Sequence, residues 1–193
     1  MRTVALIFLL LTLAVAPVWP DDFQDGMDAF NNGDYKTAFE KWKPLAELGY
    51  GRPQNNLGGM YYNGQGVTQD HKEALKWYRL SADQGHASAQ YNLGLMYYMG
   101  KGVQDFKEAA KWNRLAADQG HAKAQYRIGL MYYQGKGVIR DNVQAHKWFN
   151  IAGENGYKMG GHDRGLIEKF MTPDQITEAQ KLAREWMEKH GKK

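Results

Sequence analysis

The chain of 193 residues contains no cysteine. This absence excludes a disulfide framework, a thiolate metal site and a thiol nucleophile. A strong excess of one charge is also absent, because the formal net charge is only +4 and the basic residues are spread along the chain. The one local group is C-terminal: Lys189, Lys192 and Lys193. No basic stripe is long enough to follow a phosphate backbone, so we expect no nucleic-acid partner.

Long apolar runs are missing except at the N-terminus. Arg2 precedes an apolar or neutral run of 13 residues, Val4–Ala16, which ends in a small-x-small pattern that a signal peptidase recognises. A helix of that length spans about 20 Å, less than the roughly 30 Å of a bilayer core. We therefore expect a signal peptide at residues 1–20, a periplasmic or secreted protein, and no stable membrane span after cleavage. Because Pro17 would hinder cleavage after Ala16, another cleavage site or an uncleaved anchor stays open.

Glycine (22), tyrosine (12) and tryptophan (6) are plentiful, and they recur in a repeat. Three segments of one pattern, Asn56–Val67, Asn92–Val103 and Arg127–Val138, begin 36 and 35 residues apart. Each is followed by an aspartate, an alanine four residues later and a tryptophan seven residues later, and a glycine closes the unit. These residues are Asp70, Ala74, Trp77 and Gly85; Asp105, Ala109, Trp112 and Gly120; and Asp141, Ala145, Trp148 and Gly156.

Each unit is predicted to form two helices. In the segment 89–99, Ala89, Leu93, Met96 and Tyr97 follow the spacing of one buried helical stripe. Gly100 and Gly102 end this first helix, because glycine reaches left-handed conformations at little cost.

The second helix of the unit begins at Asp105, which can cap the free amides, and Glu108 would complete a capping box. Asp70 with Glu73 and Asp141 with Gln144 repeat the pattern. The inward stripe of this helix would be Ala109, Trp112 and Ala116. One helix pair cannot bury its own apolar face, so the units are expected to stack into an all-α solenoid.

The predicted repeats are residues 51–86, 87–121 and 122–157, with a capping region at each end. Residues 21–50 contain a degenerate repeat with a turn at Asn32–Asp34. Residues 158–193 contain a last helix that starts at the capping residue Thr172, with Pro173 at its first position and Gln175 at its third. Its inward stripe is expected to be Ile176, Ala179, Leu182, Ala183 and Trp186.

The repeat resembles the Sel-one-like repeat (SLR) family, a tetratricopeptide-like group of helical hairpins. The second unit matches the family pattern at Ala89, Tyr91, Leu93, Gly94, Tyr97, Gly100, Gly102, Val103, Asp105, Ala109, Trp112, Ala116, Ala117 and Gly120. It departs at Asn113, where tyrosine is usual, and Pro53 replaces an alanine in the first unit. The resemblance implies a right-handed α/α superhelix that acts as an adaptor, found in bacteria among exported proteins that bind regulators, envelope components or host proteins.

A second stripe on the first helix of each unit is the candidate binding surface. On a helical wheel, Tyr91, Leu95 and Tyr98 lie about 140° to 160° from Leu93, where a solvent-facing stripe should be polar. The corresponding residues of the other units are Asn55, Gly59 and Tyr62, and Tyr126, Leu130 and Tyr133. We predict that the tyrosines line a concave groove and dock a protein or peptide partner. The alternative, that they pack between neighbouring helices, stays open.

Residues that suggest catalysis have structural interpretations. His86 and His121 recur at equivalent turns, roughly 10 Å apart, which is too far to share one metal ion. Capping accounts for the recurring aspartates, and the Gly-x-Gly turns follow a helix and lack the Gly-Lys-Ser/Thr ending of a phosphate loop. No Ser-x-x-Lys or Gly-x-Ser-x-Gly motif occurs. We therefore expect no catalytic site, cofactor or metal.

Three functions stay open from the sequence. The favoured one is an exported scaffold for protein–protein interaction, with a regulatory or envelope-associated role. A β-lactam or peptidoglycan binder or hydrolase is the second, because cysteine-rich SLR relatives have such roles, although this chain lacks their cysteines. The third is a secreted, host-interacting virulence factor.

Overall fold

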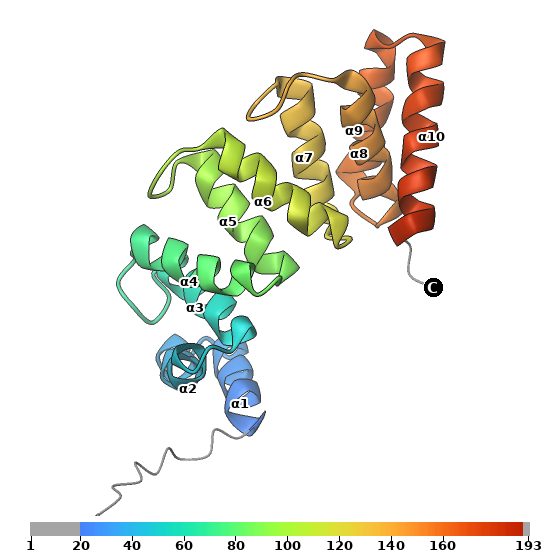
Figure 1. Ribbon diagram of the computed structural model, residues 1–193. Coiled ribbons are helices and arrows are strands. Elements are labelled where there is room, and N and C mark those ends of the chain that lie inside the picture. Colours follow the sequence, from blue (N-terminus) through green and yellow to red (C-terminus); the bar gives the residue numbers. More distant parts are fainter. Residues whose placement is uncertain (1–19, 191–193) are drawn as a thin grey trace, which may run out of the picture.

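A computed structural model describes residues 20–190 as ten α-helices and one short 3₁₀ helix, with no strand in that range. Residues 1–19, which hold nearly all of the expected signal peptide, lie outside the described part. The helices follow one another along a curved stack, with α1 at one end and α10 at the other (Figure 1). The predicted all-α solenoid is confirmed. No helix in the described range has the length and apolar character needed to cross a bilayer.

The helices alternate between two classes. A helices are the first of each unit and B helices the second. The N-terminal unit is α1 (Pro20–Asn31) with α2 (Tyr35–Glu47). The three repeats are α3 (Gly51–Asn63) with α4 (His71–Asp83), α5 (Ala87–Met99) with α6 (Phe106–Asp118), and α7 (Ala122–Gln134) with α8 (Asn142–Glu154). The C-terminal part is the A-type helix α9 (Lys158–Ile167), the 3₁₀ helix η1 (Glu168–Phe170) and α10 (Pro173–His190).

The A helices bury the predicted stripe. In α5, Ala89, Leu93, Met96 and Tyr97 are all buried, and the helix begins two residues earlier than the pattern indicated. Gly100 ends it in a left-handed conformation, φ +70°, with its amide donating to the Met96 carbonyl. Glycine suits this position because a side chain would add strain there.

The B helices are capped as predicted, but only by half of the capping box. The Asp105 carboxylate accepts hydrogen bonds from the amides of Lys107 (2.9 Å) and Glu108 (3.0 Å). The other predicted bond of the capping box, from the Asp105 amide to the Glu108 carboxylate, does not form, so that part of the prediction is wrong. The Asp105 amide instead donates to the Tyr97 carbonyl in the last turn of α5 (3.1 Å), and Glu108 accepts from the Trp112 indole (2.9 Å). The short loop brings a free helix-end carbonyl to the cap, so the amide is already satisfied.

Small residues let the two helices of a repeat approach closely. A Cβ added to Gly58 in α3 would lie 2.6 Å from the Tyr78 ring of α4, and Gly129 meets Phe149 in the same way. In the second repeat Asn113 takes the aromatic position, beside Gly94. Its amide donates to the Ala109 carbonyl at 2.8 Å. The departure from the family pattern therefore keeps the close approach and changes only the side chain that fills it.

A buried glutamine joins each repeat to the preceding B helix, a feature that the sequence reasoning missed. Gln125 donates to the Ala117 carbonyl at the end of α6 (3.0 Å) and accepts from the Asn155 amide at the end of α8 (2.8 Å). The same pair of bonds occurs at Gln90 with Ala82 and Gln119, and at Gln54 with Ala46 and Gln84. We call these residues, Gln54, Gln90 and Gln125, the glutamine clips. They fix the register in which neighbouring units stack.

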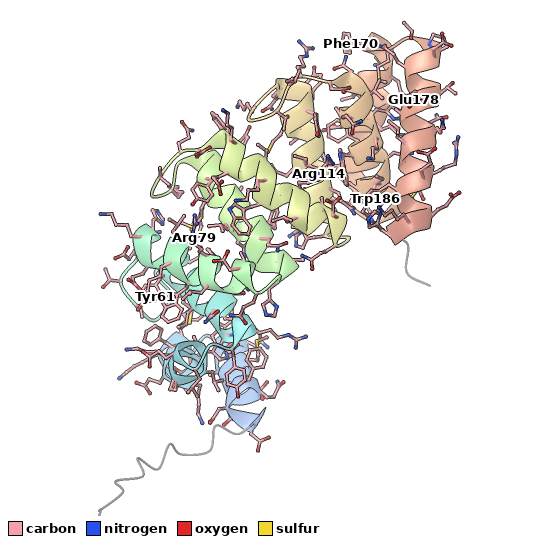
Figure 2. All side chains as sticks on the ribbon, viewed as in Figure 1. Tyr61, Arg79, Arg114, Phe170, Glu178 and Trp186 are labelled. Atoms are coloured by element: carbon pink, nitrogen blue, oxygen red, sulfur yellow. The ribbon has the colours of Figure 1, made fainter. Side chains whose placement is uncertain are left out.

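The C-terminal helix caps the stack as predicted. Thr172 and Gln175 form a full capping box, with bonds of 2.9 and 3.3 Å. Ala179, Ala183 and Trp186 are buried against α8, and the Trp186 ring meets that of Trp148 edge-on at 5.6 Å. The helix therefore covers apolar surface that a further repeat would otherwise bury. Figure 2 shows Trp186 on α10, with Glu178 near the other end of the same helix.

Candidate partner-binding face

The outward-facing residues of α3, α5, α7, α9 and η1 form one continuous surface, here named the A-helix face. The eight predicted partner-binding residues belong to α3, α5 and α7: Asn55, Tyr62, Tyr91, Leu95, Tyr98, Tyr126, Leu130 and Tyr133. Seven of them are half-buried, and Tyr133 is exposed. Hollows on this face occur near both of its ends.

One predicted groove tyrosine recurs at the same position of each repeat, and Tyr62, Tyr98 and Tyr133 are here named the tyrosine ladder. Its first two members link neighbouring A helices. The Tyr62 hydroxyl lies 3.9 Å from the Met99 sulfur, one repeat further on. The Tyr98 hydroxyl donates to Gln134 Oε1 at 2.8 Å, again one repeat on. Both rings also pack on the hydrophobic core. The contact between repeats is therefore present, and the rings also keep part of their surface on the A-helix face.

The other predicted residues divide between packing and open surface. The Tyr91 ring stacks on His121, with centroids 4.8 Å apart. The Tyr126 hydroxyl donates to Asp163 Oδ2 in α9 at 2.7 Å. Burial first, and then the Asp163 carboxylate, raise the pKa of Tyr126, so this phenol keeps its proton at neutral pH. Leu95 is half-buried in the middle of the face.

The hollow at the C-terminal end of the face, here named the C-terminal hollow, is mainly apolar. It is lined by Leu130, Tyr133, Phe149, Asp163, Leu166, Ile167 and Phe170. Its rim is unusually exposed for such residues: Tyr133 is 38%, Leu166 44% and Phe170 71% exposed. Figure 2 shows Phe170 where η1 joins α9 to α10. Large apolar side chains gathered around one hollow are typical of an interaction site, whereas single exposed ones are ordinary.

The hollows at the other end of the face share two amide side chains in an otherwise mixed lining. Asn55 and Asn56 border both of them, together with Met27 of α1. Asn92 donates to Asn55 Oδ1 at 3.1 Å, which joins α5 to α3 across the face. Amide side chains can pair with the main chain of an extended peptide, because each offers a donor and an acceptor.

Acidic residues are absent from the A half of every repeat. Residues 48–69, 84–104 and 119–140 contain no aspartate or glutamate but six basic residues. All eight acidic residues between positions 48 and 154 lie on B helices or their caps: Asp70, Glu73, Asp83, Asp105, Glu108, Asp118, Asp141 and Glu154. The six basic residues are Arg52, Lys101, Lys123, Arg127, Lys136 and Arg140. The A-helix face of the repeats thus carries one sign of charge only.

Three of these cations lie against the ladder. Arg127 and Lys136 stand over the Tyr98 ring, 5.3 and 5.0 Å from its centroid, and Lys136 also donates to the Tyr98 hydroxyl at 3.1 Å. Arg140 stands 5.7 Å from the centroid of Tyr133, at the rim of the C-terminal hollow. No carboxylate in residues 20–190 comes within 4.0 Å of these three cations, whereas Lys76 and Lys111 on the B helices are paired with glutamates.

The recurring aspartates and His121 cap helices, whereas the equivalent His86 makes no side-chain capping bond to α5. His121 Nδ1 accepts from the Ala124 amide at 3.2 Å, which caps α7. Burial, with a smaller effect of Lys123, lowers the pKa of His121, in keeping with a neutral ring that accepts a hydrogen bond. Asp70, Asp105 and Asp141 cap the B helices. In the described part of the chain, no cluster of three or more histidines and carboxylates could hold a metal ion.

Several residues of the face were missed from the sequence: Asn56, Asn92, Met99, Arg127, Lys136, Leu166 and Phe170. The constant spacing of about 36 residues between equivalent positions of the repeats could have identified them. Leu166 lies 36 residues after Leu130, and Phe170 lies 36 residues after Gln134, so both continue columns of the face into α9 and η1. The pattern is hard to recognise there because the tyrosine pair and the Gly-x-Gly turn stop after the third repeat, although Gly165 still corresponds to Gly129.

The chain is also similar to known proteins. The family model described as Sel1 repeat matches residues 54–86, 87–121 and 122–157, which together make up more than half of the chain. The chain belongs to the Sel1 repeat family. Its Sel1 repeats therefore account for the helical hairpins described above, and the resemblance read from the sequence is confirmed.

Two solved structures share the Sel1 repeat fold. One is a protective antigen present in uropathogenic Escherichia coli strains and displaying an SLR fold, at 40% identity and a TM-score of 0.75. The match covers 80% of this chain and 33% of the antigen, so the chain spans about a third of that protein. The other is a Sel1 repeat protein from Oxalobacter formigenes, at 30% identity and a TM-score of 0.73, covering 86% of this chain and 68% of that one. No curated protein matches the chain.

Proposed function

We propose that this Sel1 repeat protein is an exported docking scaffold that binds a protein partner along its A-helix face. The observation that carries the proposal is the C-terminal hollow, where exposed Tyr133, Leu166 and Phe170 surround an apolar depression. Tyrosine is among the residues that dominate binding energy at protein interfaces, and grouped exposed apolar side chains such as Leu166 and Phe170 mark interaction sites. Export is inferred from the apolar N-terminal segment alone.

Photo-cross-linking in the cell that makes the protein tests the docking surface. A photoreactive amino acid is placed at Met99, on the A-helix face, and in a matched variant at Leu80, on α4; these side chains are 50% and 42% exposed. We expect a discrete cross-linked species from position 99 and none from position 80. Equal cross-linking from both positions, or from position 80 alone, would contradict docking on this face.

A variant of Tyr98 distinguishes the two roles proposed for the tyrosine ladder, which are docking of a partner and packing between helices. Replacing Tyr98 by alanine removes its bonds to Gln134 and Lys136 as well as its ring. If the residue serves docking, the variant stays folded and loses the cross-link from position 99. A large fall in melting temperature would assign Tyr98 to packing instead.

Two direct assays test where the protein is located and whether it is an enzyme. Cell fractionation with N-terminal sequencing shows whether the chain is processed near residue 20 and whether it reaches the periplasm or the medium. Unprocessed protein found in the cytoplasm would contradict export. A β-lactam hydrolysis assay with the purified protein tests the enzymatic alternative, and clear turnover would overturn a pure scaffold role.

A further inference from the structure

We infer that the partner segment is an extended acidic peptide with a large apolar side chain, which seats that side chain in the C-terminal hollow and its carboxylates on Arg140, Arg127 and Lys136. This inference rests on the proposed docking function and names the chemistry of its partner. Two independent features carry it: cations that have no carboxylate partner among residues 20–190, and an exposed apolar hollow in the same part of the face.

The cations are placed to meet carboxylates. Lys76 and Lys111 on the B helices each have a glutamate within 3.3 Å, whereas no carboxylate of the described residues lies within 4.0 Å of Arg127, Lys136 or Arg140. Arg127 Nε is also buried without a hydrogen-bond partner in the described structure. A half-buried guanidinium of this kind gains more from an incoming carboxylate than a fully solvated one, because water screens it less.

The cations occupy two positions along the face. Arg140 lies over Tyr133, while Arg127 and Lys136 lie over Tyr98 of the preceding repeat. One carboxylate, such as a free chain end, cannot serve both positions. The arrangement therefore fits side-chain carboxylates spaced along a peptide, in register with the repeats.

The hollow supplies the apolar half of the recognition. Leu130, Leu166 and Phe170 border it, and Arg140 flanks it through Tyr133. Its one charged residue, Asp163, has both oxygens in use: Oδ2 accepts from Tyr126 at 2.7 Å, and Oδ1 pairs with His162 at 2.9 Å. These hydrogen bonds leave the negative charge of Asp163 in place, so we expect the apolar side chain of the peptide, and not one of its carboxylates, to occupy the hollow. An acidic peptide without an apolar anchor would leave the hollow open to water.

The test uses a displayed library of random peptides selected on the purified protein. We expect enriched sequences that combine aspartate or glutamate with a phenylalanine, leucine or tryptophan. Synthetic versions of an enriched peptide are then measured by fluorescence anisotropy, with the acidic residues changed to the matching amides in one version and the apolar residue changed to serine in another. Each change should weaken binding about tenfold or more.

Protein variants complete the test. Arg127→Met with Lys136→Met removes two charges but keeps the side-chain stems, so packing is preserved. Its matched control is Lys72→Met with Lys107→Met, two exposed B-helix residues. The first pair should lower affinity about tenfold and reduce the salt dependence of binding, whereas the control pair should change affinity less than about twofold. Phe170→Ser should weaken binding without changing the salt dependence.

Several outcomes would overturn the inference. These are an enriched set without acidic bias, equal affinity of the two double variants, tight binding by acidic peptides that lack an apolar residue, or no enrichment at all. If the cross-link from position 99 persists in any of these cases, docking on the A-helix face stands and only the chemistry assigned to the partner falls. If that cross-link is also absent, the proposed function falls with it.

Discussion

Replacing Gln125 by alanine should weaken the stacking of the second and third repeats, and should destabilise the protein more than a typical single substitution does. The side chain is fully buried and joins α6 to α8 through bonds to the Ala117 carbonyl and the Asn155 amide. Each bond contributes about 1 kcal/mol net, and the buried γ-methylene that alanine lacks contributes roughly 0.8 kcal/mol. We therefore expect the free energy of unfolding to fall by about 3 kcal/mol, with a melting temperature lower by roughly 6 to 12 °C.

Two further variants separate the causes. Gln125→Met keeps the methylenes and removes the amide, so it should cost about 1 to 2 kcal/mol. Lys123→Ala, an exposed change on the same helix, should cost less than about 0.5 kcal/mol.

Urea titration followed by both circular dichroism and tryptophan fluorescence measures these values, because repeat arrays need not unfold in one step. If the methionine variant were as stable as the unchanged protein, the glutamine clips would not hold neighbouring repeats together, and the account of stacking would be refuted.

Two other predictions concern the repeat turns and the contact between α8 and η1. Gly137→Ala should lower the free energy of unfolding by about 3 kcal/mol or more, because φ is +72° and the added Cβ would lie 1.9 Å from the Phe106 carbonyl oxygen. Gly156→Ala has φ +87° but open space around the added Cβ, so it should cost about 1 to 2 kcal/mol. Equal melting temperatures of the two variants would contradict this. Burial lowers the pKa of His146 below its ordinary 6.5 despite its bond to Glu168, so the folded state binds fewer protons than the unfolded one and stability falls as pH drops below about 6.5, by up to about 1.4 kcal/mol per pH unit. His146→Gln should flatten urea midpoints between pH 7 and 5.5, and an unchanged slope would assign the pH dependence to other groups.

The fold could be predicted because its signals are local. The buried stripe of α5, the left-handed Gly100 and the aspartate caps each depend on residues within a few positions of one another, so a single repeat contains the information. Three copies then made chance agreement negligible. The return bond of the capping box was wrong for the opposite reason: the partner of the Asp105 amide, the Tyr97 carbonyl, depends on the path of the loop.

The candidate site could be predicted only in part, because it depends on how repeats are placed relative to one another. A wheel drawn for one helix identified Tyr98, but its partners Gln134 and Lys136 belong to the next repeat. The glutamine clips likewise connect residues about 30 positions apart. Phe170 lies in a 3₁₀ helix, where a wheel of 100° per residue no longer applies.

Hydrogen–deuterium exchange with and without a bound peptide tests the central claim most directly, namely that the A-helix face is the docking surface. The peptide is one enriched by selection on the purified protein. The account predicts slower exchange on binding in α5, α7 and the segment from α9 to η1, with α4 and α6 unchanged. Protection confined to α4, α6 and α8, with the A helices unaffected, would contradict it.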